Sequence, residues 1–129
     1  MDFNTRPVAP LTFQDAVARV FSKYAQFSGR ASRAEFWWFM LFLFVVNTAL
    51  GIMYLITDSG IFNYIDWVFG IATIIPILTV SWRRLHDVGK GGGWFFINFV
   101  PVVGSVIFII FCAQPSEPAP NRFGEVPAN

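Results

Sequence analysis

Charged side chains are scarce in this chain of 129 residues, because Asp, Glu, Lys and Arg together make up only 13% of it. A soluble domain averages about 25% charged residues, so roughly half of the usual supply is available to cover a water-facing surface. Hydrophobic residues account for 55% of the chain and aromatic residues for 19%. This composition indicates an integral membrane protein, not a soluble globular domain.

Cysteine is nearly absent, since Cys112 is the only one. A single cysteine excludes an internal disulfide and leaves the redox compartment open. A charge excess of either sign is also missing, because the formal net charge is +1, and this balance gives no indication of nucleic acid. Segment 1–11 is polar, contains Pro7 and Pro10, and lacks the apolar stretch of a cleavable signal peptide. We expect it to be an irregular tail.

Segment 12–27 has the apolar periodicity of an amphipathic helix. Apolar side chains recur at steps of three and four residues and so share one face; they are Phe13, Ala16, Val17, Val20, Phe21 and Tyr24. Thr12, three residues before Asp15, suits an N-terminal cap. Such a helix can lie in the membrane interface or pack its apolar face on the other helices, and the two interpretations are compatible.

The apolar run 36–56 is the strongest candidate for a membrane span. It contains no charged residue and is long enough to cross the hydrocarbon core, which takes about 20 helical residues. Ser32 and Glu35 just before it form a capping-box pattern. Trp37 and Trp38 at its start are typical of the aromatic belt of membrane helices.

Two further apolar runs follow, 67–82 and 94–113. The first of them extends about 24 Å as a helix, somewhat short of the roughly 30 Å core, and Pro76 predicts a kink inside it. We expect a loop at 57–66. Pro101 and Gly104 fall near the middle of 94–113. We favour one full span there, with two half-helices that enter the membrane and return as the alternative.

Lysine and arginine residues alternate in density between these runs, which predicts the orientation. Before the first run stand Arg19, Lys23, Arg30 and Arg33, between the first and second there are none, and after the second come Arg83, Arg84 and Lys90. We therefore predict that the N-terminus and the loop after the second run are cytoplasmic. The expected fold is one all-α membrane domain, 1–129, with an amphipathic interfacial helix and three transmembrane helices. Segment 114–129, rich in proline, should be irregular.

Three motifs stand out: FSGRASRAEFWWF, RRLHDVGKGGGW and NRFG. Together they resemble a bacterial inner-membrane family, domain of unknown function 805, which includes YhaH-like proteins. The matching residues are Gly29, Arg30, Arg33, Glu35, Phe36 and Trp37, then Arg83, Arg84, Leu85, His86, Asp87 and Trp94, then Asn121, Arg122, Phe123 and Gly124. The resemblance spans about residues 20–125 and departs from the family pattern in the glycine-rich run 90–93. It implies a small multi-pass membrane protein without an established activity.

The polar residues of these motifs form the candidate site: Arg30, Arg33, Glu35, Arg83, Arg84, His86 and Asp87. In one interpretation Glu35 and Asp87 pair with the arginines and fix how the helix ends meet, because charges at this depth need partners. In another, Arg83, Arg84 and the glycine loop bind an anionic lipid headgroup or a phosphate group. A third makes His86 a general acid or base of a small membrane enzyme, and a transporter is a further alternative.

The tail motif Asn121 to Gly124 reads as a turn, and Arg122 can join the cluster only if the tail lies on the same side of the membrane. Our leading prediction is a non-catalytic scaffold, or a protein that binds a partner or lipid at the cytoplasmic interface. We assign no catalytic residue, cofactor or metal ligand. The expected partners are membrane lipids, with a protein partner or a second copy of the chain left open and no nucleic acid.

Overall fold

The computed structural model describes residues 11–124, and this part of the chain forms five helices and no strand. In chain order they are α1 (Phe13–Ser22), α2 (Arg33–Thr57), α3 (Gly60–Asp87), the 3₁₀ helix η2 (Gly92–Phe99) and α4 (Val103–Ala113). The predicted all-α class is confirmed. The outermost parts of the two predicted tails, 1–10 and 125–129, lie outside the described residues.

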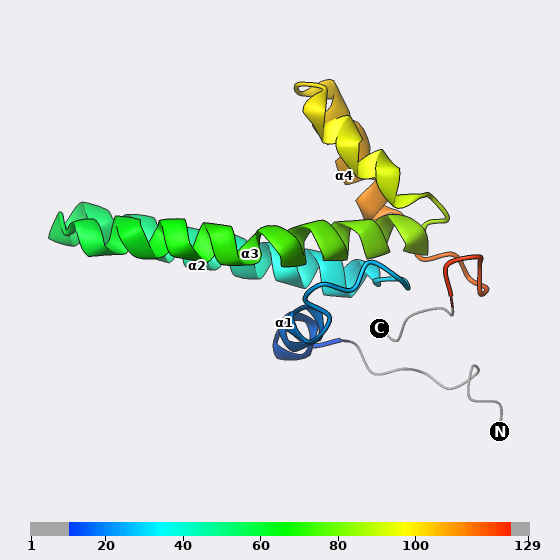
Figure 1. Cartoon of the computed structure of the whole chain (residues 1–129), viewed down its shortest axis with the longest axis horizontal. Helices are drawn as coiled ribbons and strands as arrows, with labels where there is room; N and C mark the ends of the chain where they lie inside the picture. The colour runs from blue at the N-terminus through cyan, green and yellow to red at the C-terminus, as the bar shows by residue number, and fades with distance from the viewer. Residues whose placement is uncertain (1–10, 125–129) are drawn as a thin grey trace.

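A long pair of helices, α2 and α3, dominates the molecule, and the other elements gather at one end of it (Figure 1). That end carries the start of α2 and the finish of α3, and we call it the charged end. Helix α1 lies against the pair there, and η2 with α4 projects from the same end in another direction (Figure 1). Of the described residues, the opposite end carries the tight connection between α2 and α3.

Helix α1 starts as its capping residue predicts and ends earlier than residue 27. The side chain of Thr12 accepts a hydrogen bond from the backbone N–H of Asp15 at 3.2 Å. Phe21 packs edge-on against Phe39 of α2, with ring centroids 5.6 Å apart, and Val20 is fully buried. The apolar face of α1 is therefore used for packing on α2.

Helix α3 is longer than the predicted segment, and the loop expected at 57–66 is wrong over most of its length. The connection consists of Asp58, in the left-handed region at φ 51°, and Ser59. The Ser59 hydroxyl caps α3 by accepting a hydrogen bond from the N–H of Ile61 at 3.4 Å. Apolar residues between the polar ones carry the helix through this stretch, so Asp66 lies inside α3.

Pro76 lies within α3 without ending it. Proline has no N–H, so the carbonyl four residues earlier, at Ala72, loses its helical donor. The hydroxyl of Tyr24 donates to that carbonyl at 2.5 Å. The hydroxyl of Thr79 in turn donates to the Tyr24 carbonyl at 3.1 Å. The segment after α1 thus compensates for the proline and is fixed to α3 by the same contacts.

Both long helices are long and apolar enough to cross a membrane by length and composition. In each, only 11% of the residues in the most apolar stretch are buried within the protein. Water-soluble domains do not normally leave contiguous apolar surface of this extent exposed. The exposed faces of α2 and α3 therefore fit a lipid surrounding.

The expectation of one continuous third helix over 94–113 is wrong, because the run is split into η2 and α4. The chain reverses at Pro101 and Val102, and Val102 has a positive φ of 63°. Gly104 lets the two arms approach closely, since a Cβ there would stand 1.7 Å from the carbonyl oxygen of Ile97. Helix η2 leads away from the charged end and α4 leads back to it (Figure 1). This arrangement matches the alternative that we gave for the run 94–113, two half-helices joined by a reversal.

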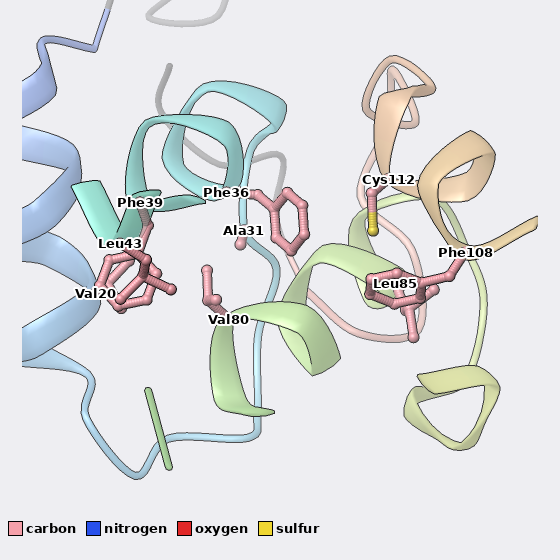
Figure 2. Packing of buried hydrophobic residues seen from close by; sticks show 9 residues of the cluster. All are labelled: Val20, Ala31, Phe36, Phe39, Leu43, Val80, Leu85, Phe108 and Cys112. Carbon is pink, nitrogen blue, oxygen red and sulfur yellow. The ribbon is translucent and has the colours of Figure 1, made fainter. Parts of the chain in front are cut away.

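The hydrophobic core is small and lies at the charged end (Figure 2). Its buried members are Val20, Ala31, Phe36, Phe39, Leu43, Val80, Leu85, Phe108 and Cys112. Figure 2 shows Val20, Phe39 and Leu43 close together, with Leu85, Phe108 and Cys112 farther along the core. The core therefore joins α1, α2, α3 and α4 at the end where the three sequence motifs lie.

Candidate functional site

Within residues 11–124, five charged side chains are buried beside this core, and we call them the buried charge cluster. They are Arg30, Glu35, Arg83, Arg84 and Asp87, none more than 4% exposed. Arg30 precedes α2, Glu35 stands in the first turn of α2, and the other three belong to the last turns of α3. Removing charges from water is costly unless each finds partners, so their pairing determines what the cluster does.

Glu35 pairs with Arg83 across α2 and α3. One carboxylate oxygen, Oε2, lies 2.6 Å from Nη1 of Arg83, and the other, Oε1, lies 3.6 Å from Nη1 of Arg19 on α1. An acidic group at a helix start and a basic group at a helix end both suit the helix dipoles. Three helices therefore meet at this one carboxylate.

Asp87 is shared by two arginines. Its Oδ1 accepts from Nε of Arg30 at 2.9 Å, and its Oδ2 accepts from Nη1 of Arg84 at 2.5 Å. Oδ2 also accepts from the hydroxyl of Ser116 in the C-terminal segment. Both carboxylate oxygens are thus engaged, and Asp87 connects the segment before α2, the end of α3 and the tail.

Arg30 holds the C-terminal tail by its backbone carbonyls. Its Nη2 donates to the carbonyl of Glu117 at 2.8 Å, and its Nη1 donates to those of Ala119 at 3.0 Å and Gly124 at 3.3 Å. The N–H of Glu117 donates to the carbonyl of Asp87 at 2.9 Å. Residues 116–124 are therefore fastened to the end of α3.

Arg84 fastens the end of α4 in the same way. Its Nε donates to the carbonyl of Cys112 at 2.9 Å, and its Nη2 donates to that of Gln114. Its Nη1 reaches the carbonyl of Ala31 at 3.3 Å. The indole N–H of Trp37 also donates to the Cys112 carbonyl, at 3.2 Å. The hairpin made by η2 and α4 is thus anchored at its C-terminal arm.

His86 joins the first motif to the last one. Its Nδ1 lies 2.9 Å from the carbonyl of Gly29, so this nitrogen carries the proton and donates. The imidazole stacks on the ring of Phe123, with centroids 3.9 Å apart and an interplanar angle of 1°. Asn121 donates to the His86 carbonyl at 3.0 Å and forms an antiparallel bridge with Gly124. The predicted turn at the tail motif is present.

Two predicted members stand apart from the buried charge cluster, because Arg33 and Arg122 are exposed. Arg33 donates to the carbonyl of Ala113 at 3.2 Å. The guanidinium of Arg122 lies over the ring of Phe123, 4.6 Å from its centroid. Arg122 also lines an open groove of about 430 Å³ together with Gly91, Gly93, Trp94 and Ile97. All three motifs nevertheless lie at the charged end.

Sequence reasoning missed two contributors to this arrangement, Tyr24 and Ser116. Tyr24 was detectable in principle, because a proline inside a helix always leaves a carbonyl in need of another donor. Ser116 lies among prolines, and no local pattern marks it as a partner of Asp87. Within residues 11–124 no group of three or more His, Cys, Asp or Glu side chains is placed to hold a metal ion.

Comparison with known proteins confirms the resemblance that the motifs indicate. Residues 24–125 match the family described as "Protein of unknown function (DUF805)". The chain is 33% identical over 108 residues to inner membrane protein YhaI of Escherichia coli (strain K12), covering 84% of this chain and 91% of the relative. It is 32% identical over 116 residues to inner membrane protein YhaH of the same strain, covering 88% and 96%. No solved structure matches this chain.

Proposed function

Since this chain belongs to the DUF805 family of proteins of unknown function, we propose that it is a non-catalytic scaffold of the bacterial inner membrane. In this role the buried charge cluster locks the C-terminal tail and the η2–α4 hairpin onto the α2–α3 pair. The locked charged end then presents one fixed surface to lipids and to any partner.

The observation that carries the proposal is the use of Arg30 and Arg84. Both side chains are buried, and they direct their N–H groups to Asp87 and to carbonyls of the chain itself. A catalytic group or a ligand-binding cation needs a face open to its substrate, and these groups have none. Their contacts support a structural role, in which polar groups specify one arrangement of the segments.

Two alternatives lose support for the same reason. Arg83 and Arg84 are fully buried, which argues against direct contact between them and a lipid headgroup. His86 is 7% exposed, and one ring face is covered by Phe123 while Nδ1 donates to Gly29. This arrangement favours a histidine that joins segments over a general acid or base.

We further propose that α2 and α3 span the membrane while the η2–α4 hairpin enters from the cytoplasmic side and returns. Helix α4 has 11 residues and extends only about 16 Å, too short for a core of roughly 30 Å. Lysine and arginine are absent between α2 and α3 and concentrated at the charged end, which favours a cytoplasmic charged end. The tail would then be cytoplasmic, with α1 in the interface.

One labelling experiment tests both the lock and the orientation. Cys112 is fully buried and is the only thiol, so we expect a membrane-impermeant maleimide to leave the wild-type protein unlabelled. Asp87→Asn removes the carboxylate that Arg30 and Arg84 share and should release the tail. In that variant we expect labelling of Cys112 in inverted inner-membrane vesicles and none in right-side-out spheroplasts.

The matched control is Asp58→Asn, which makes the same change at the exposed connection between α2 and α3. This variant should stay as unreactive as the wild type. Equal labelling of wild type and Asp87→Asn would refute the lock, and labelling of Asp87→Asn only from the spheroplast side would refute the orientation.

A further inference from the structure

The open groove beside the glycine loop is distinct from the buried charge cluster. Its walls are Gly91, Gly93, Trp94, Ile97 and Arg122, and its volume is about 430 Å³. One wall is the start of η2, and another is the tail turn that the cluster holds in place. We call it the Arg122 groove.

Arg122 is held at this groove by the turn around it. Asn121 and Gly124 exchange two backbone hydrogen bonds of 3.0 Å each. Phe123 is stacked on His86, and its ring lies below the Arg122 guanidinium at 4.6 Å. Within residues 11–124 no carboxylate lies within ion-pairing distance of Arg122. The groove therefore has a positioned, solvent-facing cation.

The glycine loop supplies a donor on the other wall. Helix η2 begins at Gly92 without a side-chain cap, and the N–H of Trp94 donates to the carbonyl of Gly91 at 3.2 Å. Within the first turn, Gly93 is the residue that both lines the groove and has an N–H without a helical acceptor. Gly92 rests directly on Trp82, since a Cβ there would stand 1.9 Å from the indole. Gly89 has a φ of +80°, and a Cβ there would stand 2.0 Å from the carboxylate of Glu117. Glycine is thus required for the loop to lie in this place.

The remaining wall is apolar. Trp94 is half exposed, and η2 continues with Phe96 and Phe99, which are 53% and 76% exposed. A ligand that suits all three walls carries a negative, hydrogen-bond-accepting group joined to a long apolar part. Basic pockets at the cytoplasmic side of membrane helices suit anionic lipid headgroups.

We propose that the Arg122 groove binds the phosphate group of an anionic phospholipid. The guanidinium of Arg122 and the N–H group of Gly93 at the start of η2 bind the phosphate oxygens. The acyl chains run along Trp94, Ile97 and the exposed phenylalanines of η2. This site rests on the proposed scaffold, because the locked tail keeps Arg122 opposite the glycine loop.

The test measures lipid binding by the full-length protein in detergent, using native mass spectrometry with dioleoylphosphatidylglycerol and dioleoylphosphatidylcholine as probes. We expect preference for phosphatidylglycerol. Arg122→Gln should weaken that binding by about fivefold, the effect of one basic residue at a membrane surface. Gly93→Asp should weaken it too, because the new carboxylate would face the phosphate and repel it. The fold should tolerate this change, since a Cβ at Gly93 meets no atom within 4 Å.

The matched control is Arg33→Gln, which removes an exposed arginine of the same end that does not line the groove. It should keep wild-type binding within about twofold. Equal losses in Arg33→Gln and Arg122→Gln, or unchanged binding in Arg122→Gln, would overturn the proposal. If millimolar inorganic phosphate displaced phosphatidylglycerol, the groove would be a site for free phosphate, and the proposal that it binds a phospholipid would be wrong.

Thermal unfolding separates a failed groove from a failed scaffold. Arg122→Gln should melt as the wild type does, because Arg122 is exposed. A lowered melting temperature in this variant would make Arg122 part of the fold and overturn its assignment as a ligand. Asp87→Asn reports on the lock independently through the reactivity of Cys112.

Discussion

Replacing Glu35 by glutamine should cost this protein a large part of its stability. Glu35 is fully buried, and its Oε2 lies 2.6 Å from Nη1 of Arg83. Within residues 11–124, Nε and Nη2 of Arg83 have no hydrogen-bond partner. The glutamine keeps the shape of the side chain and removes the one carboxylate that pairs with this guanidinium in the described part of the chain. Leaving one member of a buried pair uncompensated costs about 3–5 kcal/mol.

Other cations near Glu35 add to this effect. Arg19 lies 3.6 Å from Oε1. Burial lowers the pKa of Lys23, the positive charges of Arg83 and Arg19 lower it further, and Glu35 opposes them. Without the carboxylate, these cations face one another across α1 and α3. The loss should therefore fall in the upper part of the range, about 4–5 kcal/mol, which corresponds to a shift in the unfolding equilibrium of about a thousandfold or more.

A double-mutant cycle measures the interaction free energy between Glu35 and Arg83 directly. We would follow unfolding in detergent by the fluorescence of the five tryptophans for Glu35→Gln, Arg83→Met and the double variant. Replacing a whole buried ion pair by neutral groups is often nearly neutral, so the double variant should lose much less than the two single losses added together. A Glu35→Gln variant within about 1 kcal/mol of wild type, or simple additivity in the cycle, would refute the reasoning.

Two further predictions concern the connections around the core. Tyr24→Phe should destabilise the protein by about 1 kcal/mol, because it removes the donor to the carbonyl that Pro76 leaves free. The same substitution should have little effect in a Pro76→Ala background, where the helix supplies its own donor; an equal loss in both backgrounds would contradict this account. Gly104→Ala should force the two arms of the η2–α4 hairpin apart, since the new Cβ would meet a carbonyl oxygen at 1.7 Å. Its melting temperature should fall and Cys112 should become reactive, whereas Gly93→Ala should change neither.

The first residues of α1 and α2 were predictable from the sequence, because a clear capping residue precedes each helix. Thr12 and Ser32 each accept a hydrogen bond from the N–H three residues later, as the local pattern predicts. The start of α3 was harder to predict, because Asp58 and Asp66 both suggest a loop. Only Ser59, between them, marks the start of the helix. A polar residue such as Asp66 can lie in a loop or within the first two turns of a helix, so it does not distinguish the two.

The reversal in the third apolar run could not be decided from the run itself. Pro101 and Gly104 are compatible with a kinked span and with a hairpin. The difference comes from distant contacts, above all from Arg84 to the carbonyl of Cys112 and from Trp37 to the same carbonyl. These contacts draw the end of α4 back to the charged end, and no local propensity encodes them.

The sequence predicts which residues form the buried charge cluster, but it does not predict which arginine pairs with which carboxylate. Arg83 and Arg84 are adjacent in a helix, so their side chains point about 100° apart. Arg83 therefore reaches Glu35, while Arg84 reaches Asp87 and the tail. The sequence indicates that the carboxylates pair with arginines, but the orientation of α3 decides which carboxylate each arginine meets.

The charge balance of the cluster explains why it holds a tail at all. Within residues 11–124, Arg30, Arg83 and Arg84 form ion pairs only with Glu35 and Asp87, so one positive charge has no carboxylate of its own there. Carbonyl oxygens at the C-terminal ends of α4 and α3 compensate this charge in place of a carboxylate. Arg84 donates to the carbonyl of Cys112, and Arg30 donates to that of Asp87. These carbonyls carry the negative ends of the two helix dipoles.

Arginine suits this task better than lysine or apolar residues. Its planar group offers five donors, enough to bind a carboxylate and several carbonyls at fixed angles. Apolar packing selects poorly among arrangements in a bilayer, because lipid tails are as apolar as the side chains. Directed bonds from Arg30 to Glu117, Ala119 and Gly124 distinguish one docking of the tail from every shifted one. The excess of arginine is therefore the physical means by which a mostly apolar chain fixes its polar end.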